Sequence, residues 1–228
     1  MGVGSLLPGA DLVLPSLWEG VAGTREVNWG VQRADGKFEF SPEMARCWQW
    51  KDELPERGLA LVGKHFGRWA AVIAPRLAGA AYATAAERRE SLSALQHEVV
   101  DAVRHQGPCT GPELRELTGA DKKAVDTAVV GLQRALVLTN ARLIEQRQGW
   151  GAIAVDLVER LWELPAVPEP ELDLARAVLA SSGEISAADL GGALGRRLRP
   201  AHEALDELVE RGEATRRSDG EVVLYGSA

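Results

Sequence analysis

Three helix signals in a row, followed by a hairpin signal, constrain the fold of this chain more than any other feature. Apolar residues recur on one helical face of 91–106, and Gly107-Pro108 ends that helix. Thr110 has the spacing of a capping box for a second helix, and Asp121 can cap a third. Two β-leaning segments separated by a turn come next. Helix, helix, helix and hairpin is the element order of a winged helix, which we therefore predict for 91–164.

The same order of elements recurs after the proline-rich segment 165–171, which has the composition of an interdomain connector. Its hairpin turn is Asp219-Gly220, a dipeptide that favours tight hairpins. We therefore predict a mainly helical α+β chain with small β-hairpins. It has tandem winged helix-turn-helix domains at 91–164 and 165–228, preceded by an N-terminal α/β unit at 1–90.

Residues 1–90 give less regular signals. We expect a short helix that opens at Pro15-Ser16, a strand within 66–75 and a helix over 75–90. In Trp48-Gln49-Trp50-Lys51, tryptophans alternate with polar residues, which is typical of an extended segment with one buried face. We expect both tryptophans to form the wall of a core. A cleft for DNA or a base and an acid/base site are the alternatives.

The third helix of the middle domain has two different faces. Val125, Val129 and Leu132 form an apolar stripe, and polar side chains lie opposite them. In a helix-turn-helix, the later helix enters the DNA major groove, and wing residues contact the backbone or the minor groove. The candidate DNA-binding residues are therefore Lys122, Lys123, Thr127 and Arg134 on the helix and Arg142, Arg147 and Trp150 on the wing. The alternative is an ordinary solvated face, with the wing tryptophan tucked against its own domain.

Acidic residues are concentrated at the carboxyl end of the chain. The formal net charge is −7, and residues 165–228 carry 7 basic and 12 acidic residues. DNA affinity comes largely from Lys and Arg that neutralise phosphates, so this balance disfavours the last domain as a DNA reader. Glu203 and Glu207 lie on the outer face of its third helix and would oppose phosphates. We expect this domain to pack or to contact a protein partner, although Arg216 and Arg217 could still hold a DNA backbone.

Motifs for the common catalytic chemistries are absent from the sequence. There is no GxSxG, GxGxxG, Walker loop or HExxH. A hidden carboxylate site stays open, with Asp52 and Glu53 as its candidates. Lys51 and Arg57 would pair with these carboxylates as easily as shift their pKa, and together with Lys64 they are free to line a cleft.

Nothing in the composition points to a metal or a cofactor. Cys47 and Cys109 are too few for a disulfide framework or a cysteine-rich zinc site, and we expect buried, unreactive thiols. No window has the roughly 18 consecutive apolar residues of a membrane helix, and the amino terminus lacks a signal-peptide pattern. We therefore expect a cytoplasmic protein with no cofactor, no metal site and no membrane partner.

Three segments carry a resemblance to a known family. They are LPSLWEGVAG (14–23), WQWKDELPERGLALVGK (48–64) and the run at 132–162. Together they resemble the AlkZ-related branch of the AlkZ/YcaQ-like winged-helix superfamily, whose better-known members are bacterial DNA glycosylases that remove alkylated or crosslinked purines. The resemblance covers most of 12–165 and implies a tandem winged-helix fold that binds double-stranded DNA, with base-excision chemistry in the glycosylase members.

The chain departs from the catalytic pattern of those glycosylases, in which a Gln-x-Gln or Gln-x-Asp motif near the amino terminus positions the attacking water. Here Gln32 is followed two positions later by Ala34, and Gln49 by Lys51. The literal Gln146-Arg147-Gln148 falls on the predicted wing, which is the wrong structural context. The catalytic role is therefore not carried over onto it.

Three functions stay open from the sequence. The first is a DNA-binding tandem winged-helix protein related to alkyl-DNA glycosylases that lacks their usual catalytic pair. The second is an active DNA glycosylase in alkylation or crosslink repair that uses a substitute carboxylate such as Asp52 or Glu53. The third is a winged-helix module for protein–protein interaction, which the charge of −7 favours. The sequence leaves open whether the chain is an enzyme.

Overall fold

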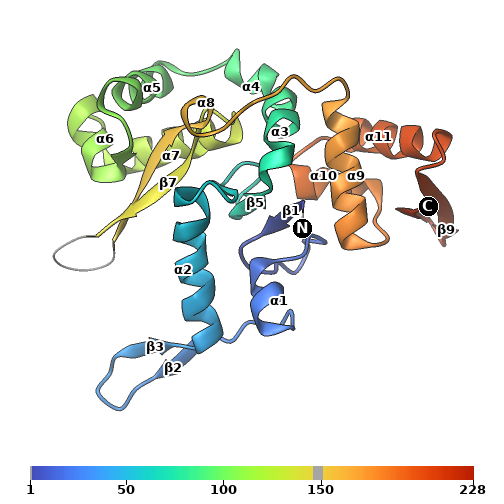
Figure 1. Cartoon of the computed structure of the whole chain (residues 1–228), viewed down its shortest axis with the longest axis horizontal. Coiled ribbons are helices and arrows are strands. Elements are labelled where there is room, and N and C mark those ends of the chain that lie inside the picture. The colour runs from blue at the N-terminus through green and yellow to red at the C-terminus, as the bar shows by residue number, and fades with distance from the viewer. Residues whose placement is uncertain (1, 146–150) are drawn as a thin grey trace.

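The computed structural model describes residues 2–145 and 151–228. The fold is α+β, as predicted, because helices alternate with strands that pair in small antiparallel sheets. Figure 1 shows the helices of residues 94–134 on one side of the molecule and those of residues 170–210 on the other, with β1 (Val3–Ser5) and β5 (Ala71–Ile73) between them. Within the described ranges, no helix is long and apolar enough to span a membrane.

The N-terminal part is built around a three-stranded sheet in the order β1-β5-β4. Its strands are β1 (Val3–Ser5), β4 (Leu61–Gly63) and β5 (Ala71–Ile73), and every residue in them is buried. The expected helix at Ser16 is α1 (Leu17–Ala22), and Ser16 forms a capping box with Glu19. The predicted helix over 75–90 forms as three short pieces: η1 (Pro75–Leu77), α3 (Ala78–Thr84) and α4 (Ala86–Arg89).

The segment around Trp48 is helical, so its prediction as an extended segment is wrong. A hairpin of β2 (Gly30–Gln32) and β3 (Phe38–Phe40) leads into α2 (Pro42–Glu56). Ser41 caps α2 by accepting a hydrogen bond of 3.1 Å from the Met44 backbone N–H. Pro42 lies at the first position of the helix, and no residue of α2 is β-branched. The local propensities therefore favour a helix, although residues 48–51 alternate as in a strand.

The helical geometry also separates the two tryptophans. Residues two apart on a helix point roughly 200° away from each other. Trp48 is therefore half-buried, whereas the side of α2 that carries Trp50 faces solvent and leaves this residue 37% exposed. The prediction that both tryptophans form a core wall fails for Trp50.

The middle part contains the predicted three helices and hairpin. They are α5 (Ala94–Gln106), α6 (Gly111–Thr118), α7 (Lys122–Arg134), β7 (Leu138–Ile144) and β8 (Ala152–Leu157), followed by α8 (Val158–Leu161). A two-residue strand, β6 (Cys109–Thr110), pairs with β8. The predicted cap Asp121 accepts a hydrogen bond of 3.0 Å from the Ala124 backbone N–H. This part has a hydrophobic core of its own, which includes Val99, Leu114, Val125, Leu132 and Leu157.

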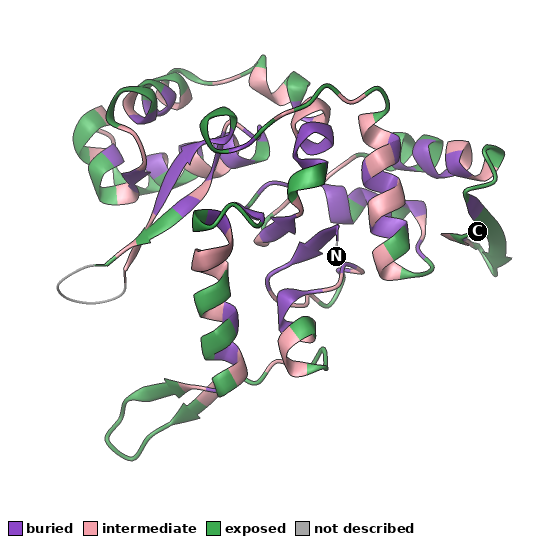
Figure 2. Cartoon of the chain, viewed as in Figure 1, coloured by how far each residue is buried: buried purple, intermediate pink, exposed green. Residues whose placement is uncertain are grey.

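The C-terminal part repeats the element order and shares its core with the N-terminal sheet. Its elements are α9 (Pro170–Ser182), α10 (Ala187–Leu194), α11 (Leu198–Glu210), β9 (Ala214–Asp219) and β10 (Val222–Ser227). Val3 and Ile73 of the sheet belong to the same buried cluster as Leu174 and Leu205 of the helices. Figure 2 shows this buried band running from the strands into α9 and α10. The first and last parts of the chain are therefore one packed body.

A buried hydrogen-bond network joins the N-terminal sheet to the buried face of α7. His65 follows β4 and is fully buried, with Nδ1 3.0 Å from the Gln133 carbonyl oxygen and Nε2 3.2 Å from Thr139 Oγ1. A carbonyl oxygen only accepts, so Nδ1 carries the proton of the neutral ring. The Lys64 backbone N–H donates to Gln133 Oε1 over 2.9 Å. Burial lowers the pKa of His65 to about 4, although the hydrogen bond to the Gln133 backbone opposes this effect.

Candidate nucleic-acid interface

The helix α7 has one buried and one exposed face. Its buried residues include Val125, Ala128 and Leu132. The exposed residues include four of the predicted DNA contacts: Lys122, Lys123, Thr127 and Arg134. A cavity of about 510 Å³ lies between this face and the start of α5. Its lining residues include Lys123 and Thr127 from α7 and Ser93 and Gln96 from the α5 side.

The charges of the basic side chains on this face are largely unpaired. In the part of the chain that the structure describes, Lys122, Lys123 and Arg134 form no ion pair. Two guanidinium nitrogens of Arg134 lie 3.4 and 3.5 Å from the Gly67 carbonyl oxygen, which are long hydrogen bonds. The positive charge of all three side chains is therefore available to an anion.

The β7–β8 hairpin, which is the predicted wing, can be followed only in part. Arg142 lies on β7 and is exposed, next to a register shift in the β7–β8 pairing between Asn140 and Arg142. Arg147 and Trp150 lie outside the described residues, and so does the segment Gln146-Arg147-Gln148. Their proposed roles stay predictions.

A cavity of about 290 Å³ lies beside the wing, between α2 and the β7–β8 hairpin. It is lined by Phe40, Trp48, Lys51, Asp52, Leu143, Gly151 and Ile153. The ring of Trp48 is 5.7 Å from that of Phe40 between centroids, and Lys51 Nζ lies 5.3 Å from the Trp48 centroid. Lys51 also pairs with the Asp52 carboxylate, and both side chains are largely buried. Aromatic faces beside a polar pair could stack a planar base.

The other candidates on α2 and after it lie elsewhere. Glu53 accepts a hydrogen bond of 2.6 Å from Gln49 Nε2 on the helix surface. Arg57 is the exposed C-cap of α2, and the Lys64 side chain is exposed after β4. None of Glu53, Arg57 and Lys64 lines the cavity beside the wing. The structure therefore brings together only Lys51 and Asp52 from that set.

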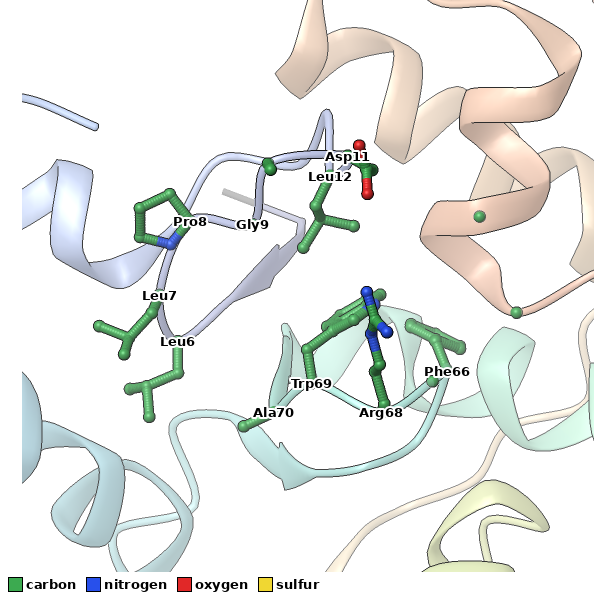
Figure 3. Close-up of a pocket in the computed structure, with 14 residues that line it drawn as sticks. Leu6, Leu7, Pro8, Gly9, Asp11, Leu12, Phe66, Arg68, Trp69 and Ala70 are labelled. Carbon is green, nitrogen blue, oxygen red and sulfur yellow. The ribbon is translucent and has the colours of Figure 1, made fainter. Parts of the chain in front are cut away.

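A further cavity, of about 610 Å³, lies between the segments 6–12 and 66–70 and the helix α10, and no sequence pattern indicated it. Figure 3 shows Arg68 and Trp69 on one wall and Asp11 and Leu12 on the other. The walls are mostly apolar and come from segments far apart in the chain. Only tertiary packing creates this cavity, so no local pattern could have predicted it.

The acidic surface of the C-terminal part is largely paired with its own arginines. Arg199 Nε donates to Glu203 over 2.7 Å, and Arg211 Nε donates to Glu207 over the same distance. Arg217 Nε donates to Glu184 over 2.8 Å. The hydrogen bond from Arg217 lowers the pKa of the Glu184 carboxyl. These pairs engage Glu203 and Glu207, the two carboxylates expected to oppose phosphates.

The cysteines and histidines form no metal-binding group. Cys47 and Cys109 are buried, as predicted, and burial raises the pKa of both thiols. Across residues 2–145 and 151–228, no three His, Cys, Asp or Glu side chains come together in a way that could hold a metal ion.

One comparison with a solved structure agrees with this architecture. The structure is similar to the DNA glycosylase AlkZ of Streptomyces sahachiroi, with a TM-score of 0.52 and 16% identity over 92% of this chain. This chain spans 61% of the length of that protein. A second similarity, to the DIP2311 protein from Corynebacterium diphtheriae, has a TM-score of 0.25 and 14% identity, over 89% of this chain and 42% of that one. No curated protein matches the chain.

The family comparison covers the N-terminal part, the middle part and most of α9. The model of the family described as AlkZ related matches residues 6–180, and this range includes α2, the exposed face of α7 and the cavity beside the wing. The match confirms the family resemblance expected from residues 14–23, 48–64 and 132–162. The chain belongs to the AlkZ-related family.

Proposed function

We propose that this chain is a double-stranded DNA-binding protein with two tandem winged helices, in which α7 is the recognition helix and β7–β8 the wing. The order of three helices and a hairpin in both halves supports this arrangement. The observation that carries the proposal is the outward face of α7. Lys123, Thr127 and Arg134 are exposed there, and neither cation has an acidic partner among the residues that the structure describes. The similarity to a DNA glycosylase supports DNA as the partner.

The test is the fluorescence anisotropy of a labelled mixed-sequence duplex at low and at near-physiological salt. We expect affinity that falls steeply as salt rises, because bound cations are released from the phosphates. Lys123→Ala and Arg134→Ala should each weaken binding and reduce the salt slope by about one.

Arg104→Ala is the matched control, because Arg104 is an exposed arginine that pairs with Asp101 on α5, away from this face. It should bind as the wild type does. Wild-type affinity in the Lys123 and Arg134 variants would remove α7 from the interface.

A second candidate function is DNA glycosylase activity, and the specific observation for it is Asp52 in the aromatic cavity beside the wing. A carboxylate there could position a water molecule next to a stacked nucleotide. The Lys51 partner already neutralises this carboxylate, so we rank the activity second. The assay is base release from an alkylated duplex. Asp52→Asn should abolish release, and Glu53→Gln should leave it unchanged.

The third hypothesis is a protein-interaction module whose partner binds the acidic C-terminal part. The absence of DNA binding in the anisotropy assay would favour it. If the wild-type chain shows no salt-sensitive affinity for a duplex, the chain would be better explained as a module that contacts a protein partner through its acidic C-terminal part. A cytoplasmic location remains a prediction from the sequence.

A further inference from the structure

Arginines from distant parts of the chain converge where α4 meets the start of α11. A cavity of about 650 Å³ lies there, lined by Glu87, Arg88, Ser91, Gly195, Arg196, Arg197 and Pro200. Arg88 comes from the segment before the middle part, whereas Arg196 and Arg197 come from the turn between α10 and α11. Residues 87–91 and residues 195–200 therefore line the cavity together.

Two of these arginines are fixed in place by backbone oxygens. Arg88 Nη1 donates to the Arg134 carbonyl over 3.0 Å, and Arg88 Nη2 donates to the Gly195 carbonyl over 2.8 Å. Arg196 donates to the Thr84 carbonyl and pairs with Glu171 over 2.6 Å. Glu171 offsets the charge of Arg196, whereas the carbonyl oxygens that hold Arg88 orient its guanidinium group without cancelling its charge. The lining is thus preorganised and still positive.

Arg197 differs from its two neighbours because its side chain is exposed. It precedes α11, and among the described residues no carboxylate pairs with it. Its guanidinium is free to turn towards a ligand in the cavity. Ser91, whose hydroxyl makes only a long contact of 3.5 Å with the Glu87 carbonyl, adds a neutral donor on the rim.

The local charge balance is opposite to that of the whole chain. Burial lowers the pKa of Arg88, and the positive charges of Arg196 and Arg134 lower it further. Glu171 and Glu87 oppose this effect only in part. Three guanidinium groups and the nearby Arg134 thus face two carboxylates. An anion with several acceptor oxygens would relieve this repulsion and take charge-assisted hydrogen bonds.

The arginine cavity continues the exposed face of α7. Ser91 lines the arginine cavity and Ser93, two residues later, lines the cavity along α7. Arg134 ends α7, and its carbonyl oxygen holds Arg88. A strand backbone that follows α7 from Lys123 to Arg134 would therefore arrive at this cavity.

We propose that the arginine cavity is a phosphate-binding site and that its ligand in a DNA complex is a backbone phosphate beyond the end of α7. The choice of a DNA phosphate rests on the proposed function, whereas the phosphate chemistry does not. The C-terminal part then contributes to the DNA surface through the start of α11, although its outer face is acidic.

The first arm of the test measures duplex affinity against salt for three variants of the full chain. Arg197→Gln removes the charge of the exposed arginine without touching the contacts of Arg88 and Arg196, so the variant should fold. Its slope of log affinity against log salt should fall by about one, as for any lost phosphate contact. Arg197→Lys keeps the charge and should keep the slope, and Arg104→Gln is the control for an arginine elsewhere.

The second arm measures the melting temperature of the chain without DNA in inorganic phosphate, against sodium chloride at matched ionic strength. Phosphate that binds the folded state raises the melting temperature of the wild type, and Arg197→Gln should reduce this rise. A phosphate effect together with an unchanged DNA slope would identify free phosphate as the ligand. If neither the slope nor the phosphate effect depends on Arg197, the site does not exist. If the wild type binds no DNA at all, the proposed function fails and the phosphate arm alone decides.

Discussion

Lowering the pH should destabilise this protein through His65, which is buried where the N-terminal sheet meets α7. Burial lowers the pKa of this imidazole from 6.5 to about 4. In the unfolded chain it takes up a proton near pH 6.5, whereas in the folded chain it stays neutral until about pH 4. The unfolded state therefore binds more protons throughout this window. The stability contribution is fully present above pH 6.5 and is lost as the pH falls towards 4.

The size of the effect follows from these two pKa values. Each unit of separation corresponds to about 1.4 kcal/mol, so the free energy of unfolding should fall by about 2 kcal/mol between pH 7.5 and pH 5 on account of His65 alone. Carboxylates add their own pH dependence to the total. A comparison of wild type and variant isolates the histidine, because the carboxylates are common to both.

Urea unfolding of the wild type and of His65→Asn at the two pH values is the assay. Asparagine can keep the hydrogen bond to the Gln133 carbonyl but does not titrate, so the stability gap between wild type and variant should shrink by about 2 kcal/mol at pH 5. His97→Asn, at an exposed position on α5, should show the same gap at both pH values. A constant gap for His65→Asn would refute the argument. If that variant does not fold, an NMR titration of the wild type should find His65 neutral at pH 5.

Four further substitutions test side-chain burial, backbone fit and helix capping. Trp18 is 1% exposed, so Trp18→Ala should cost about 3–5 kcal/mol in urea unfolding, whereas Trp50→Ala, at a site 37% exposed, should cost about 1 kcal/mol or less. Gly195 has a φ of +60°, and a Cβ there would lie 1.7 Å from the Phe66 carbonyl oxygen, so Gly195→Ala should lower the melting temperature by several degrees. Asp121→Ala removes the cap of α7 and should cost about 1 kcal/mol in urea unfolding.

The sequence predicted those elements whose signals are local. Ser16 and Asp121 cap the helices expected after them, and the buried and exposed faces of α7 follow its apolar stripe. These features depend on residues within one or two helical turns. The helix α2 was missed because Trp48-Gln49-Trp50-Lys51 mimics a strand over four residues, while its cap at Ser41 lies seven positions earlier.

The site was predictable only where it lies on one element. The exposed residues of α7 could be read from helical spacing. The cavity beside the wing joins α2 to the hairpin about 100 positions later, and the arginine cavity joins Arg88 to Arg197. No periodicity connects such distant segments, because their proximity is a property of the tertiary fold. Lys51 and Asp52 were singled out for their residue types, whereas the aromatic walls around them could not be foreseen.

The charge of −7 argues less strongly against DNA binding than the sequence suggested. A phosphate responds to unpaired cations within about 10 Å, the screening length in 0.1 M salt, and not to the total charge of the chain. Several carboxylates of the C-terminal part form salt bridges with arginines: Glu184 with Arg217, Glu203 with Arg199 and Glu207 with Arg211. Lys122 and Lys123 have no such partners within the described ranges.

If this reasoning holds, Glu203→Gln should strengthen duplex binding, because it frees Arg199 near the arginine cavity. Glu184→Gln, on the hairpin side of the C-terminal part, should have a smaller effect. Equal effects of the two substitutions in the anisotropy assay would mean that net charge, and not its placement, governs the affinity.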